Sequence, residues 1–145
     1  MKKIILFVAL ATLGIAFNAC SSDDSGSSTN VGGSITVKID NVSTTFDNIN
    51  VTERDTTDND VELRIIATND SSESITFFTY KQSLGSDKLD YFYYNSTEES
   101  FYGSSGFSSH VITNNDGKLI GTFSGTVTNG GEEKTLTDGT FNITY

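Results

Sequence analysis

Between residues 118 and 127 the sequence reads Lys-Leu-Ile-Gly-Thr-Phe-Ser-Gly-Thr-Val, with small or apolar side chains at every second position. These positions are Leu119, Gly121, Phe123, Gly125 and Val127. The positions between them carry mainly threonine and serine, which suit the water-facing side of a strand. A period of two indicates a strand with one buried face. This segment therefore predicts a long strand, and its two glycines predict a bulge or a close backbone approach.

The same alternation recurs along the rest of the chain. Shorter runs fall at residues 35–39, 46–51, 61–65, 75–80, 89–94, 111–113 and 141–145. Groups of Asn, Asp, Ser and Gly separate them, as in Asn114-Asn115-Asp116-Gly117, and such residues are typical of turns between antiparallel strands. The predicted fold class is all-β: an antiparallel β-sandwich or flattened up-and-down barrel of about 8–10 short strands. Residues 34–145 should form it as a single domain.

The N-terminal segment has a different character. Met1-Lys2-Lys3 is positively charged and precedes an apolar run from Ile4 to Phe17. This run is shorter than the roughly 20 residues that a membrane-spanning helix needs, and it matches the apolar part of a secretory signal peptide. Residues 1–19 are therefore predicted to be a signal peptide with a helical apolar segment.

The only cysteine of the chain, Cys20, ends the segment Phe17-Asn18-Ala19-Cys20 and is followed by a serine-rich polar tract. This arrangement resembles a bacterial lipoprotein signal peptide with its lipobox. The resemblance implies that Cys20 receives a diacylglyceryl group and becomes the acylated N-terminus, which attaches the protein to a membrane. The alternative is a lone buried cysteine after an uncleaved helix.

Residues 20–33 are predicted to be a flexible tether, because Val31 is the only apolar side chain after the cysteine and such segments bury too little area to become ordered. Within it, Ser22-Asp23-Asp24 resembles the short acidic export signal of Bacteroidota surface lipoproteins. That resemblance implies an outer-membrane location with the domain displayed on the cell surface. The alternative is the periplasmic face of the envelope.

The C-terminal third carries another resemblance. Residues 118–127 are followed by Leu136-Thr137-Asp138-Gly139-Thr140-Phe141-Asn142-Ile143, so that Gly-Thr-Phe occurs twice. This pattern is similar to small Bacteroidota lipoproteins with a β-sandwich domain of unknown function. The resemblance implies the fold and carries no established activity.

Composition excludes several classes of function. The 145 residues carry a net charge of −10, which argues against nucleic acid as a partner. One cysteine and one histidine exclude Cys-rich and His-rich metal sites, and we expect no cofactor. His110 has Ser108, Ser109 and Asp116 near it in the sequence, but an exposed or half-buried residue at the start of a strand is the favoured interpretation. No catalytic residue is predicted.

Two features remain as candidate sites. Oxygen ligands at close spacing suit calcium, and they occur at Asp55, Asp58, Asp60 and Glu62. That segment lacks the glycine of a known calcium loop, so a solvated turn is favoured. The second feature is a group of aromatic residues between positions 77 and 107, where the alternation places rings on both faces of strands. A ligand or partner patch is predicted at Tyr80, Tyr91, Tyr93, Tyr94 and Tyr102; the alternative is a core with cross-strand tyrosine pairs.

These observations predict a non-catalytic, lipid-anchored binding or interaction module of the cell envelope, monomeric as a domain, with a glycan or a protein as ligand. An accessory or structural subunit of an outer-membrane complex is the alternative. A small hydrolase and a lipocalin-like carrier are less favoured, because no catalytic motif is present and the domain is small for a barrel with a large cavity.

Overall fold

The computed structural model describes residues 28–145, which form eleven β-strands and no helix. The strands are β1 (Ser28–Ile39), β2 (Val42–Phe46), β3 (Asn48–Asp55), β4 (Val61–Thr68), β5 (Ser74–Tyr80), β6 (Gly85–Ser86), β7 (Asp90–Asn95), β8 (Ser100–Gly103), β9 (Ser108–Asn115), β10 (Lys118–Thr128) and β11 (Glu133–Thr144). The all-β prediction is confirmed. The predicted signal peptide, Cys20 and Ser22-Asp23-Asp24 lie outside the described residues.

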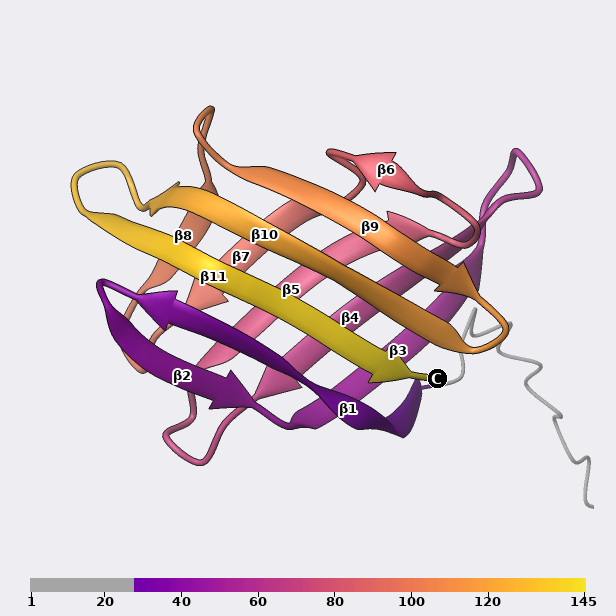
Figure 1. Ribbon diagram of the computed structural model, residues 1–145, viewed down its shortest axis with the longest axis horizontal. Coiled ribbons are helices and arrows are strands. Elements are labelled where there is room, and N and C mark those ends of the chain that lie inside the picture. The colour runs from indigo at the N-terminus through magenta and orange to yellow at the C-terminus, as the bar shows by residue number, and fades with distance from the viewer. Residues whose placement is uncertain (1–27) are drawn as a thin grey trace, which may run out of the picture.

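The strands pair antiparallel around a closed ring. The ring runs β1, β3, β4, β5, β7, β8, β10, β11 and back to β1, while β2 pairs with β1, β9 with β10, and β6 with β9. In Figure 1, β9, β10, β11, β1 and β2 form a front layer that crosses a back layer of β3, β4, β5, β7 and β8. The two predicted architectures therefore describe one object: a flattened barrel whose sides pack on each other like the sheets of a sandwich.

Strand β1 begins inside the predicted tether. Residues 28–31 pair with β3, and the strand from Gly32 onward pairs with β11. Gly33 has a φ of 128°, and a Cβ there would meet the backbone of Asn142. The predicted domain boundary at residue 34 is therefore wrong. The prediction considered only side-chain burial, whereas backbone hydrogen bonds to neighbouring strands order this segment although Val31 is its one apolar side chain.

Strand β10 also takes part in both layers. Its first part pairs with β9 and its last two residues pair with β8. Gly125 lies at this change with a φ of 135°, and a Cβ there would meet the backbone of Gly106 and Phe107. A Cβ on Gly121 would meet the ring of Phe141. The register shifts beside both glycines, which confirms the close approach predicted for them.

Phenylalanine rings fill the space between the layers. Phe77 of the back layer lies 5.4 Å from Phe141 of the front layer, measured between ring centroids, and Phe92 lies 5.0 Å from Phe123 in the same way. Phe107, from the loop between β8 and β9, packs 4.4 Å from Phe92. Such tilted ring pairs are favourable beyond the area they bury. The inward positions of both layers therefore form one aromatic core.

Candidate functional site

Aromatic side chains also gather on the outer face of the back layer, away from the core. Along β5 and β7, Phe77 and Phe92 point inward, so their neighbours Phe78 and Tyr93 point outward. We call the outward rings the aromatic patch: Phe78, Tyr91, Tyr93 and Tyr102. Tyr91 is 71% exposed and Tyr102 is 50% exposed. Large apolar side chains grouped on the surface commonly mark a contact site.

A β-bulge places Tyr91 in the patch. The register between β5 and β7 shifts between Thr76 and Phe78, so β7 carries one extra residue there. Tyr91 has a φ of 49°, an uncommon conformation for a bulky residue. The extra residue allows Leu89 to remain buried while Tyr91 faces out, although plain alternation would put both on one face. Strained residues of this kind concentrate at functional sites.

The rings of the aromatic patch hold one another in place. Tyr93 and Tyr102 lie opposite each other on β7 and β8, with ring centroids 5.1 Å apart and planes at 74°. Phe78 and Tyr91 lie 5.9 Å apart with planes at 80°. The guanidinium carbon of Arg64 lies 5.9 Å from the centre of the Phe78 ring. Edge-to-face pairs and a cation over a ring are both favourable arrangements, so the patch is pre-organised.

A cleft of about 290 Å³ opens beside these rings. It is lined by Leu89, Tyr91, Phe92, Tyr93, Tyr102, Gly103, Ser104 and Phe107. Phe92 and Phe107 belong to the packed core, which gives the cleft a firm apolar wall. Tyrosine side chains combine an apolar ring with a polar hydroxyl. The cleft can therefore hold the apolar face of a sugar ring or a side chain and offer hydrogen bonds at its edge.

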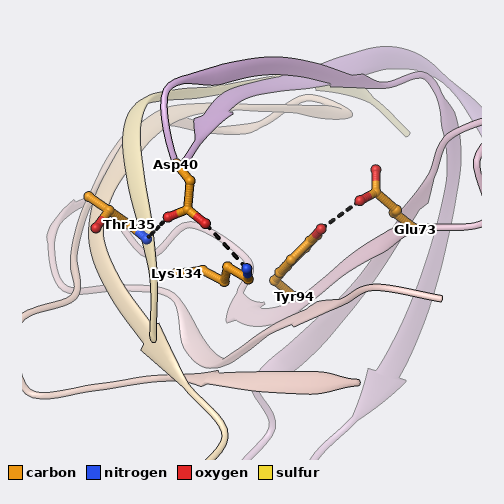
Figure 2. A network of polar contacts seen from close by, with 5 residues as sticks. All are labelled: Asp40, Glu73, Tyr94, Lys134 and Thr135. Carbon is orange, nitrogen blue, oxygen red and sulfur yellow. Dashed lines mark hydrogen bonds and ion pairs between the residues drawn. The ribbon is translucent and has the colours of Figure 1, made fainter. Parts of the chain in front are cut away.

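Tyr94, which the sequence placed in the patch, lies inside the barrel with 4% of its surface exposed. Its hydroxyl donates a hydrogen bond to Glu73 Oε1 at 2.6 Å, as Figure 2 shows. Burial, with the Glu73 hydrogen bond adding to it, raises the pKa of Tyr94 above its usual range. The prediction for Tyr94 is wrong because the residue shares the inward face of β7 with Phe92.

Tyr94 belongs to a network that joins turns and strands at one end of the barrel (Figure 2). Asp40, in the turn after β1, accepts a hydrogen bond of 2.9 Å from the backbone N–H of Thr135 and lies 3.3 Å from the ammonium of Lys134. That ammonium lies 5.8 Å from the centre of the Phe101 ring, and Phe101 stacks on Tyr94. These contacts stabilise the fold at that end.

Tyr80 lies apart from the cleft, in the acidic hollow after β3. This hollow, of about 440 Å³, is lined by Arg54, Asp55, Thr56, Thr57, Asp58, Asp60, Glu62 and Tyr80. Arg54 Nη2 lies 3.5 Å from Glu62 Oε2. Within residues 28–145, no three His, Cys, Asp or Glu side chains are placed to hold a metal ion. The acidic segment forms the largely exposed hairpin loop between β3 and β4.

His110 is an exposed residue of β9. Its Nδ1 lies 3.3 Å from the Oγ of Ser86. The ion pairs found in the described part of the chain all use Lys or Arg, and none includes His110. Its partner is therefore a hydroxyl and not the carboxylate that orients a catalytic imidazole.

Three of the five predicted tyrosines meet in the cleft, and the predicted patch left out Phe78, Leu89 and Phe107. For Phe78 a signal existed: Phe77 and Phe78 are consecutive in a strand, so one ring must face outward. Phe107 gave no such signal, because it lies in a loop whose path depends on the strands that it joins.

Comparisons with models of protein families, with curated protein sequences and with solved structures find no match. The resemblance to Bacteroidota lipoproteins therefore stays a prediction from the sequence. In the part of the chain that the structure describes, no helix has the length and hydropathy needed to cross a membrane.

Proposed function

We propose that this protein is a non-catalytic binding module of the bacterial cell envelope, attached by a lipid on Cys20, and that it contacts a glycan or a protein ligand through the aromatic patch. The observation that carries the proposal is Tyr91. Its aromatic ring is mostly exposed and its backbone is strained, at a bulge beside a cleft. The bulge keeps Leu89 buried, but the exposed ring of Tyr91 buries no apolar surface of its own and is presented to a partner.

The N-terminal sequence supports the envelope location. A lipid on Cys20 would hold the domain at the membrane, and Asp23-Asp24 would direct it to the exterior. Strand β1 includes Ser28, so at most residues 21–27 would separate the sheet from a lipid on Cys20. A surface-anchored module of this kind has its outer faces available for ligand.

The alternative is an accessory subunit of an outer-membrane complex, in which a neighbouring subunit would cover the same patch. A lipocalin-like carrier is disfavoured, because packed phenylalanine rings occupy the space between the layers. A hydrolase is disfavoured by the exposed position of His110 and its hydroxyl partner.

The ligand test compares a pair of tyrosines that line the cleft with a single tyrosine that lies apart from it. The full-length protein, a Tyr91→Ser/Tyr102→Ser variant and a Tyr80→Ser control are applied to a printed glycan array and to a panel of purified envelope and host-surface proteins. We expect at least one target to bind both the wild type and the control but not the double variant. If the double variant binds every target as the wild type does, or if no target binds the wild type, the proposed ligand surface is wrong.

The anchor is tested by cell fractionation. Cys20→Ala should move the protein out of the detergent phase, because the acyl chains supply the membrane affinity. Unchanged partitioning would contradict the lipoprotein prediction.

The surface location is tested by protease treatment of intact cells, with lysed cells as the control. The wild type should be digested on intact cells, and Asp23→Ala/Asp24→Ala should be protected until lysis. Equal digestion of both proteins would remove the export signal from the proposal, and protection of the wild type would place the domain inside the envelope.

A further inference from the structure

The outer face of the front layer carries a second hollow, on the other side of the barrel from the aromatic patch. It is an open trough of about 830 Å³ over β9, β10 and β11, bounded by β6. We call it the hydroxyl trough. Side chains with small polar groups dominate its lining, among them Ser86, Ser108, His110, Thr122, Ser124 and Thr140.

The strand register sets four of these side chains in one row. Ser86 pairs with His110, His110 with Thr122, and Thr122 with Thr140, each across one strand boundary. All four side chains are exposed. Neighbouring strands lie about 4.8 Å apart, so the row is about 14 Å long. Beyond it, Thr140 shares a 2.8 Å hydroxyl–hydroxyl hydrogen bond with Thr36.

The charges of the trough disfavour an anionic ligand. No Lys or Arg lines it, and the two acids that do, Asp87 and Asp138, have partners within the protein. Asp87 Oδ1 accepts a hydrogen bond of 3.2 Å from the Ser109 backbone N–H, and Asp138 Oδ2 lies 2.7 Å from Lys38 Nζ. The carboxylates, in a protein with a net charge of −10, repel phosphate and sulfate. Carboxylates and hydroxyls both accept hydrogen bonds from neutral hydroxyl groups.

A protein partner also fits this face poorly. Protein interfaces depend on buried aromatic or aliphatic anchors, and the exposed side chains of the row are serine, histidine and threonine. Serine and threonine hydroxyls both donate and accept hydrogen bonds, which matches a ligand that presents hydroxyls along its length.

We propose that the hydroxyl trough is a binding site for a neutral saccharide chain, lying across β9, β10 and β11 with its hydroxyl groups on the row from Ser86 to Thr140. The site is separate from the aromatic patch, and the proposal holds whether or not that patch binds a ligand.

The test is an NMR titration of the ¹⁵N-labelled full-length protein in detergent. The probes are maltotriose, cellotriose and tri-N-acetylchitotriose, with trigalacturonic acid as the anionic counterpart. We expect at least one neutral trisaccharide to shift the amide signals of Thr122, Ser124 and Thr140 with saturation, and the anionic sugar to leave them unmoved. No shift at these residues with any neutral probe, or an equal shift with the anionic sugar, would overturn the proposal. Shifts confined to Tyr93 and Tyr102 would overturn it too, since they would assign the sugar to the aromatic patch.

Two variants separate binding from folding. Thr122→Val/Thr140→Val removes both hydroxyls but keeps the branched shape that suits a strand. It should weaken binding by about tenfold or more, because each lost hydrogen bond accounts for about fivefold. Thr52→Val, on the outer face of the back layer, should leave the affinity unchanged. Unchanged affinity in a folded Thr122→Val/Thr140→Val protein would also overturn the proposal.

Discussion

The outer faces of the two layers follow the same strand alternation but carry different chemistry. On the front layer, cross-strand neighbours such as Thr36 and Thr140 meet through hydroxyls. On the back layer, the cross-strand neighbours Tyr93 and Tyr102 meet through their rings. The inner faces do not differ in this way, since both supply phenylalanine to a shared core.

This difference separates residues that hold the fold from residues that are available for other tasks. The inner faces bury the apolar area that stabilises the domain. The hydroxyl of an outward threonine is hydrated by water, whereas an outward ring such as Tyr91 leaves apolar surface exposed. The outer faces should therefore tolerate substitution with little loss of stability, and the following predictions test that expectation.

The largest effect is expected where β10 passes from one layer to the other. Gly125→Ala places a Cβ against the backbone of Gly106 and Phe107 at a positive φ. Overpacking and backbone strain together should lower the free energy of unfolding by about 3 kcal/mol. Urea denaturation measures the change.

The matched control is Gly131→Ala, because a Cβ at Gly131 meets nothing within 4 Å and its φ is not positive. It should change stability by less than about 0.5 kcal/mol. If Gly125→Ala changes the free energy of unfolding as little as Gly131→Ala does, the backbone of Gly106 and Phe107 does not approach Gly125 as closely as the structure indicates.

The next effect compares adjacent tyrosines on opposite sides of β7. Tyr94→Phe removes the hydroxyl that bonds Glu73, leaving a carboxylate without that donor. We expect a loss of about 1–2 kcal/mol in the free energy of unfolding. Tyr93→Phe, on the outer face, should cost far less. Equal losses measured by urea denaturation would mean that the two faces of β7 do not differ as described.

The same residue should make stability depend on alkaline pH. The pKa of Tyr94 is raised above its ordinary value of 10.0, and the pKa of Tyr145 is raised as well, chiefly by burial. Above that pH the unfolded chain releases these protons while the folded protein keeps them, so the free energy of unfolding falls as pH rises. Below pH 10.0, the stabilising contribution of these two protonated tyrosines is fully present. Tyr94→Phe should give a shallower fall between about pH 9 and pH 11 in urea titrations; an unchanged slope would remove Tyr94 as a cause.

A smaller effect tests the bulge. Tyr91→Gly should give a protein about 1 kcal/mol more stable than Tyr91→Ala, because glycine adopts a φ of 49° without strain. Both variants should lose any ligand of the aromatic patch. Thermal unfolding of the two variants provides the comparison, and if the alanine variant is the more stable one, the backbone at this position is not strained.

The smallest effect concerns the front layer. Thr36→Val removes the exposed hydrogen bond with Thr140 and should change the free energy of unfolding by less than about 0.5 kcal/mol. A loss above about 1 kcal/mol in urea denaturation would show that the threonine row holds the sheet together, and its hydroxyls would then be less available to a ligand.

Much of the fold could be predicted from alternation and turn residues, because a strand with one buried face repeats every two positions. The prediction failed where order depends on partners distant in the sequence. Residues 28–33 pair with β3 and β11, and their composition carries no sign of it. For the site, the outward rings could be expected from consecutive aromatics. Which of the consecutive Tyr93 and Tyr94 faces inward could not, because a β-bulge places Tyr94, and not Tyr93, on the same side of the strand as the buried Leu89.

The sequence by itself determined that the alternating runs between residues 35 and 145 would form antiparallel strands, since local periodicity and turn chemistry act over a few residues. It also determined the acidic charge of the protein and the number of aromatic rings. Only the tertiary structure decided that Tyr91, Tyr93 and Tyr102 line one cleft and that Ser86, His110, Thr122 and Thr140 line up in one row. Both arrangements depend on register and ring closure, which arise from hydrogen bonds between strands far apart in the chain.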